Sequence, residues 1–167
     1  GKKYAVRCFH KNADHLESRY SAISRKIVTD ASSYFLGFEF QERGVEVNGK
    51  RYPLVKMDWA EGLTLGTYLE RNYQDREKIA QLRSNFSLLE EHLRKSGIAH
   101  GDLQNGNVIV NNGIQLIDYD GMFVPGIPNE SGVEVGHPHF QHPKRVSKSF
   151  GASMDRFSFV LIDLSLA

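Results

Sequence analysis

The chain has 167 residues, of which 40% are hydrophobic and 25% are charged, a composition typical of an ordinary globular domain. Its 21 Lys and Arg against 20 Asp and Glu leave a net charge of +1, which gives no reason to expect nucleic acid or an anionic membrane as a partner. No apolar run approaches the roughly 18 residues of a membrane span. Cys8 is the only cysteine, and we expect a small buried residue in a protein of the reducing cytoplasm.

The first third of the chain predicts a small antiparallel sheet with one helix. Residues 3–10 alternate and are rich in strand formers, which predicts a strand. A helical face is predicted from the spacing of Leu16, Tyr20, Ile23 and Ile27. An aromatic-rich strand is predicted over 34–40, with its rings in the core. Asn48-Gly49 favours a type I′ turn, after which the chain returns as a further strand to Met57.

The pattern changes at Gly62, after which mainly helical structure is expected. A short helix is predicted over 63–69, and a long helix with an apolar face ends at Gly97. Two short apolar runs, 108–110 and 114–117, predict a second hairpin. A long loop over 121–153 and an apolar helix over 157–166 follow. This order predicts an α+β fold, with a boundary near residues 58–61.

Three polar residues border the second hairpin. Asn107 opens its first strand, Asp118 ends its second, and Asp102 lies on the loop before it. The hairpin is expected to bring the amide and the carboxylate together as hard oxygen ligands suited to Mg²⁺. Asp102 can orient a hydroxyl and accept its proton, and phosphoryl transfer needs little more from a protein. The alternative is that all three are ordinary turn residues.

The residues from His100 to Asn107, followed by Asp118-Tyr119-Asp120-Gly121, resemble the protein-kinase signature H-R-D-L-x-x-x-N and D-F-G. The resemblance implies a protein-kinase-like bilobal fold, incomplete at both ends. Residues 1–57 would form a partial N-terminal lobe, 58–62 the hinge, and 63–167 a partial C-terminal lobe. It also implies that Asp102 is the catalytic base, that Asn107 and Asp118 hold magnesium, and that Asp120 is a secondary metal ligand.

Two further segments extend the resemblance to an ATP site. Residues 5–7 are similar to the V-A-I-K strand, with Arg7 in place of the lysine that holds the phosphates, and residues 55–62 are similar to the gatekeeper and hinge. ATP and Mg²⁺ are the implied cofactors. The residues implied to contact ATP are Ala5, Arg7, Met57, Asp58, Ala60 and Ile109.

The later segments point to the substrate. Residues 136–143 resemble the substrate-side loop of protein kinases, and Asp155-Arg156-Phe157-Ser158 resembles the helix start whose aspartate braces the catalytic loop. The implied activity is ATP-dependent phosphoryl transfer to Ser or Thr hydroxyls of a protein substrate. More narrowly, the combined motifs look like a group of poorly characterised bacterial kinase-like proteins.

Departures from the family pattern keep two alternatives open. Arg7, Gln104 and the lack of a well-placed helix glutamate, since Glu17 comes early, motivate a pseudokinase that binds nucleotide as a scaffold. Gly101 in place of the arginine of H-R-D predicts independence from activation-loop phosphorylation, and it also resembles aminoglycoside and choline phosphotransferases. His100 is expected to be structural. The histidines of 137–142 are expected to make local hydrogen bonds rather than bind zinc.

Overall fold

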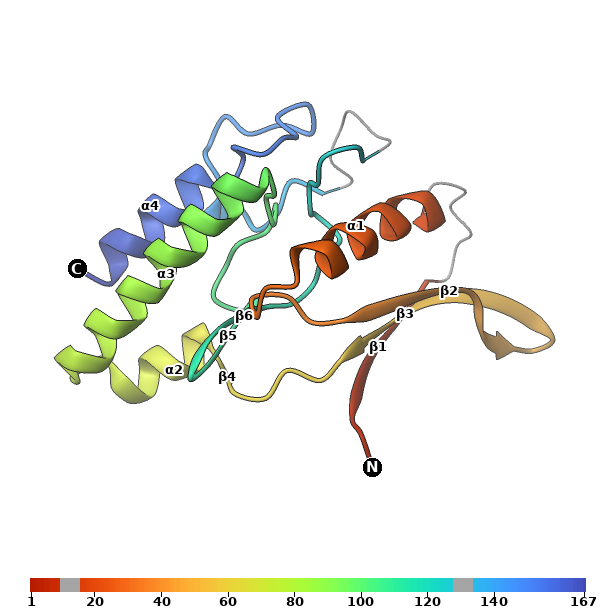
Figure 1. Cartoon of the computed structure of the whole chain (residues 1–167), viewed down its shortest axis with the longest axis horizontal. Coiled ribbons are helices and arrows are strands. Elements are labelled where there is room, and N and C mark those ends of the chain that lie inside the picture. The colour runs from red at the N-terminus through yellow and green to blue at the C-terminus, as the bar shows by residue number, and fades with distance from the viewer. Residues whose placement is uncertain (10–15, 128–133) are drawn as a thin grey trace.

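The structure is a computed structural model of the chain, and it describes residues 1–9, 16–127 and 134–167. A sheet with one helix occupies one end of the molecule, and three helices around a second sheet occupy the other (Figure 1). The last residue of the first predicted strand, His10, and residues 128–133 of the predicted loop lie outside the described residues.

The first sheet has the antiparallel order β1-β3-β2. Asn48 and Gly49 both have positive φ, 51° and 75°, which confirms the tight turn expected between β2 and β3. The strand predicted from residue 34 begins only at Phe38, because Phe35 pairs instead with Leu116 of the second sheet. The elements of this part are β1 (Tyr4–Cys8), α1 (Leu16–Asp30), β2 (Phe38–Val47) and β3 (Lys50–Asp58).

Helix α1 packs on the first sheet through the apolar face that the sequence predicts. Ile23 is fully buried, and the ring of Tyr20 stacks on that of Phe40 with centroids 5.5 Å apart. The prediction that Cys8 is buried is wrong. Cys8 is exposed because β1 is an edge strand on which every residue is exposed.

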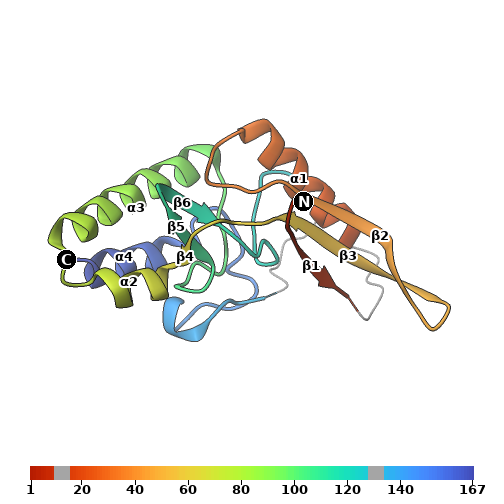
Figure 2. The same cartoon turned by 90° about the horizontal axis from the view of Figure 1, so that it is seen from below.

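The second sheet has the antiparallel order β4-β5-β6 and lies beside α3 (Figure 2). Residues 63–64 form β4 rather than the start of a helix, because they pair with Ile109 and Val110. The long helix ends as predicted at Gly97, whose φ of 66° suits a glycine. The elements of this part are β4 (Leu63–Thr64), α2 (Leu65–Asn72), α3 (Arg76–Ser96), β5 (Val108–Asn111), β6 (Gly113–Leu116), a 3₁₀ turn (Pro138–Phe140) and α4 (Arg156–Ser165).

One hydrophobic core joins the two parts, since residues of α1 and β3 belong to the same buried cluster as those of α3 and β6. Leu89 of α3 and Leu116 of β6 are completely buried in it. The fold is therefore α+β, as predicted, with four α-helices and two small antiparallel sheets in the part of the chain that the structure describes. None of the helices there is long and apolar enough to cross a membrane.

Candidate functional site

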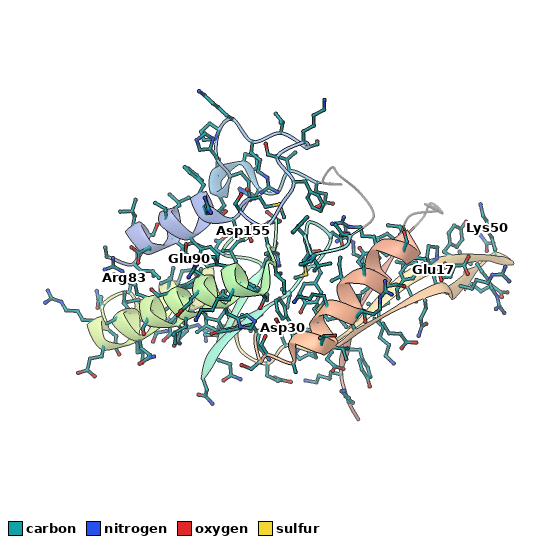
Figure 3. All side chains as sticks on the ribbon, turned by 45° about the horizontal axis from the view of Figure 1, so that its top comes forward. Glu17, Asp30, Lys50, Arg83, Glu90 and Asp155 are labelled. Atoms are coloured by element: carbon teal, nitrogen blue, oxygen red, sulfur yellow. The ribbon has the colours of Figure 1, made fainter. Side chains whose placement is uncertain are left out.

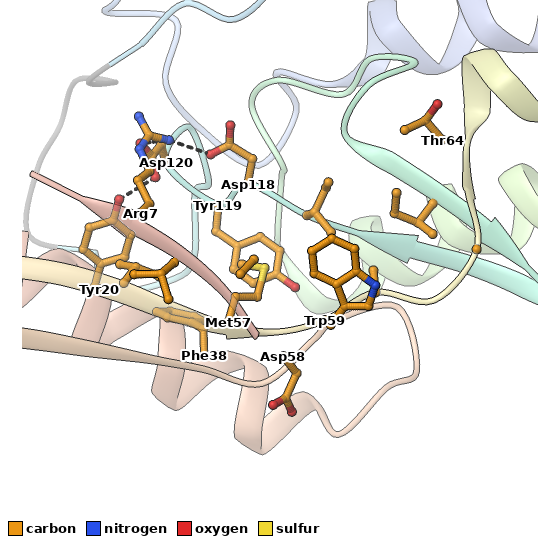
Figure 4. Close-up of a pocket in the computed structure, with 17 residues that line it drawn as sticks. Arg7, Tyr20, Phe38, Met57, Asp58, Trp59, Thr64, Asp118, Tyr119 and Asp120 are labelled. Carbon is orange, nitrogen blue, oxygen red and sulfur yellow. Dashed lines mark hydrogen bonds and ion pairs between the residues drawn. The ribbon is translucent and has the colours of Figure 1, made fainter. Parts of the chain in front are cut away.

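A cavity of about 440 Å³ opens between the first sheet and the second hairpin (Figure 4). Ala5 on β1 and Met57 on β3 are register partners, so they face the cavity from neighbouring strands. Ile109 of β5 lines the opposite side. The cavity is bordered by all six residues that the resemblance assigns to ATP, namely Ala5, Arg7, Met57, Asp58, Ala60 and Ile109.

The cavity has an apolar interior and one strongly charged end. Val6, Val55 and Ile117 line its apolar part, and Trp59 stands half exposed at its edge. The charged end is formed by Arg7 together with the two carboxylates of the segment that follows β6. Such a combination of an apolar chamber and a few converging polar groups suits a small ligand that has a flat apolar part and a charged part.

Asp102 and Asn107 form one hydrogen-bonded group outside the lining of this cavity. The Nδ2 of Asn107 donates to Oδ2 of Asp102 at 2.9 Å, and the Nε2 of Gln104 donates to the same oxygen at 3.0 Å. The backbone N–H of His137 donates to Oδ1 of Asp102 at 2.6 Å. The loop that resembles the substrate-side loop therefore touches the proposed catalytic base.

Asp118 lies close to Asn107 because of the hairpin. The N–H of Ile117 donates to the carbonyl of Asn107 at 3.0 Å, so Asp118 directly follows the backbone partner of Asn107. Asp118 has a φ of 64°, a left-handed conformation that is uncommon for a residue other than glycine. The buried Tyr119 anchors this turn, since its hydroxyl donates to the carbonyl of Leu116 at 2.9 Å. The side chain of Asp118 is left 42% exposed at the cavity.

Asp155, at the start of α4 (Figure 3), braces the loop that carries Asp102. One oxygen of Asp155 accepts the N–H of Gly101 at 2.8 Å, and the other accepts the N–H of His100. The ring of His100 is fully buried, and its Nε2–H donates to the carbonyl of Ile117 at 2.9 Å. This bond ties the loop to the hairpin, so His100 has the structural place expected for it.

Gly101 is required by its surroundings. Its φ is 84°, and a Cβ there would collide with the carbonyl of Gly121. Arg145 donates to the carbonyl of Gly101 at 2.8 Å, so the segment that follows the 3₁₀ turn also holds the loop. Gly101, which stands in place of the arginine of the H-R-D motif, thus occupies a position where only glycine fits.

Arg7 lies between carboxylates rather than free in the cavity. Its Nη1 is 2.9 Å from Oδ1 of Asp118 and 2.5 Å from Oδ2 of Asp120, and its Nη2 is 3.9 Å from Glu134. Burial, as the largest cause, raises the pKa of Asp120, whose side chain is only 14% exposed. Burial likewise raises the pKa of Glu134, with the charge of Asp120 adding to it. The guanidinium is therefore the counter-charge of this end of the cavity.

Two consecutive residues of α1 contact the same segment, and no pattern in the sequence indicated this contact. The hydroxyl of Tyr20 donates to Oδ1 of Asp120 at 2.5 Å. The guanidinium of Arg19, buried almost completely, donates to the carbonyls of Asp120 and Met122 at 2.7 and 2.8 Å. Helical spacing identified Tyr20 only as an apolar core residue, and nothing local distinguishes Arg19 from a surface arginine.

The oxygen donors of Asn107 and Asp118 suit magnesium in kind. The amide nitrogen of Asn107 is engaged by Asp102, which leaves its Oδ1 as the atom available to a cation. In the described ranges, no group of three or more His, Cys, Asp or Glu side chains is arranged to hold a metal ion. The Nδ1 atoms of His137 and His142 accept backbone N–H groups two residues ahead, as expected for local rather than zinc-binding histidines.

Comparison of the chain with protein-family models and with curated proteins found no match in either case.

Proposed function

We propose that the chain is a protein-kinase-like domain that binds ATP with magnesium in the cavity and transfers a phosphoryl group to Ser or Thr hydroxyls of a protein. In this proposal, residues 1–57 belong to an N-terminal lobe, residues 63–167 belong to a C-terminal lobe, and 58–62 is the hinge between them. The observation that carries the proposal is convergence on one cavity. Residues of β1, the 58–62 segment, β5 and the turn after β6 meet there, with Asp118 at its charged end.

The apolar part of the cavity would hold the adenine. Ala5 and Ile109 would enclose the ring from the two sheets, with Met57 at the rear. Backbone groups of Asp58 and Ala60 would supply the hydrogen bonds, because Asp58 ends β3, Ala60 follows it, and both border the cavity. Arg7 at the charged end would then face the phosphates.

Oδ1 of Asn107 and the carboxylate of Asp118 would hold the magnesium ion, which neutralises charge on the transferring phosphoryl group. Asp102 would orient the acceptor hydroxyl and take its proton. Hydrogen bonds from Gln104 and Asn107 fix the direction of this carboxylate. The contact from His137 places the 136–143 loop beside Asp102, which favours a protein acceptor over a small alcohol.

Nucleotide binding and transfer should be measured separately. We expect ATP to bind more tightly with Mg²⁺ than without it, and Asp118→Asn to remove this difference while leaving the fold intact. Asp102→Asn should keep magnesium-dependent binding and lose transfer of labelled phosphate to protein. The matched control is Asp163→Asn, which replaces an aspartate at the surface of α4. ATP binding that does not respond to Mg²⁺ in the unsubstituted chain would refute the proposed site.

A second candidate is a nucleotide-binding scaffold without transfer. The ion pair between Arg7 and Asp118 favours it, because Arg7 competes with the ion for the proposed magnesium ligand, which would weaken the positioning of the ion for transfer. In that case magnesium-dependent ATP binding occurs with no transfer to protein or small-alcohol acceptors. Asp102→Asn would then be indistinguishable from the unsubstituted chain in every assay.

A further inference from the structure

Helix α1 does not offer an acidic partner to Arg7. Its two acidic residues are Glu17, which is exposed, and Asp30, whose oxygens bind His92 and Ser96 at 2.7 and 2.9 Å. The charge opposite Arg7 comes instead from the turn after β6. What α1 contributes is a neutral hydroxyl, that of Tyr20.

The two oxygens of Asp120 have different partners. Oδ1 accepts the hydroxyl of Tyr20, and Oδ2 binds the guanidinium of Arg7, so the carboxylate joins the helix to the strand (Figure 4). Tyr20 is itself 3% exposed and packs against the rings of both Phe38 and Phe40. A hydroxyl on such a fixed ring determines the direction of the carboxylate that it contacts.

We propose that Tyr20 and Asp120 are positioning residues for Arg7. Tyr20 orients the carboxylate of Asp120, and this carboxylate holds the guanidinium at the phosphate end of the cavity. This assigns Asp120 to Arg7 rather than to magnesium, since both of its oxygens already have protein partners. The direction toward phosphate rests on the proposed function. The connection among the three side chains does not.

The ion pairs of Arg7 with Asp118 and with Asp120 differ in their exposure to solvent. The pair with Asp118 joins side chains that are 47% and 42% exposed, whereas Asp120 is 14% exposed and is held by Tyr20. Exposed ion pairs contribute little stability. When Asp118 turns to a cation, Arg7 therefore stays attached to Asp120. Its Nε, and its Nη2 that lies 3.9 Å from Glu134, would then face the phosphate oxygens.

The first test is a double-mutant cycle on nucleotide affinity. Tyr20→Phe keeps the ring and removes only the hydroxyl, and we expect affinity for Mg²⁺–ATP to fall about 5-fold while affinity for adenosine is unchanged. In an Arg7→Met background the same substitution should have no further effect, because Tyr20 acts through Arg7. An equal loss in both backgrounds, or an equal loss for adenosine, would show a packing role and overturn the proposal. Tyr34→Phe, remote from Asp120, is the matched control.

The second test needs no ligand. In Asp118→Asn, Arg7 keeps its close ion pair with Asp120 and the longer one with Glu134. The close pair should restrict rotation of the guanidinium and keep its Nη–H NMR signals resolved at low temperature. Adding Tyr20→Phe should collapse these signals, whereas adding Tyr34→Phe should not. Resolved signals in the variant that carries both Asp118→Asn and Tyr20→Phe would overturn the proposal. If the signals follow the expected pattern but the chain binds no ATP, the proposed function is wrong and the connection among Tyr20, Asp120 and Arg7 stands.

Discussion

Replacing Asp155 by asparagine tests the brace beneath the proposed catalytic loop. The two carboxylate oxygens accept backbone N–H groups from two consecutive residues, His100 and Gly101. Asparagine keeps one acceptor oxygen but turns an NH₂ group toward the other backbone donor. One hydrogen bond to a charged acceptor is lost, and two donors face each other in a site where Asp155 is 3% exposed.

The expected loss in the free energy of unfolding follows from the lost hydrogen bond and the unpaired donor. A hydrogen bond to a charged group contributes roughly 1.5–3 kcal/mol, and a buried donor left without a partner adds roughly 1–3 kcal/mol. Burial raises the pKa of Asp155, so removing its charge recovers part of the cost of burying the carboxylate. We therefore expect the free energy of unfolding to fall by about 2–4 kcal/mol.

Urea unfolding followed by circular dichroism at pH 7 measures this loss. Asp163→Asn on the same helix is the matched control, because Asp163 lies at the surface and should lose much less. Amide hydrogen exchange then locates the effect, and we expect faster exchange at Gly101 in Asp155→Asn alone. Equal stabilities for the two variants, or unchanged exchange at Gly101, would refute the idea that Asp155 holds the loop in place.

Three further substitutions follow from local geometry. Arg83 donates two hydrogen bonds to Asp163, which lower the pKa of that carboxyl below its usual 3.8. The stability lost in Asp163→Asn at pH 7 should therefore shrink as urea unfolding is repeated at pH values below 3.8, and it should disappear below the lowered pKa. Gly101→Ala should lower the melting temperature strongly, whereas Gly113→Ala, whose Cβ meets open space, should not. Leu89→Ala should cost about 2–5 kcal/mol in urea unfolding, while its exposed neighbour Leu88 tolerates alanine; equal costs would contradict the assigned core face.

Local patterns were sufficient for most of the secondary structure. Helical spacing found the buried face of α1, and Asn48-Gly49 found the turn between β2 and β3, because both signals depend on neighbours within a few residues. The predictions failed where distant partners decide. Residues 63–64 form a strand because they pair with β5. Cys8 is exposed because β1 lies at the edge of its sheet.

In the candidate site, too, the sequence predicted the local contacts but not those between distant residues. The interval between Asp102 and Asn107 is short, so the sequence by itself determined that an acid and an amide meet at the start of a hairpin. Arg7 and Asp118 lie 111 positions apart, and Tyr20 and Asp120 lie 100 apart. Only packing of α1 and β1 against the turn after β6 could bring them together. The resemblance assigned Arg7 and Asp118 to one site, but their direct contact, like that of Tyr20 with Asp120, depends on the whole core rather than on the residues that flank either partner.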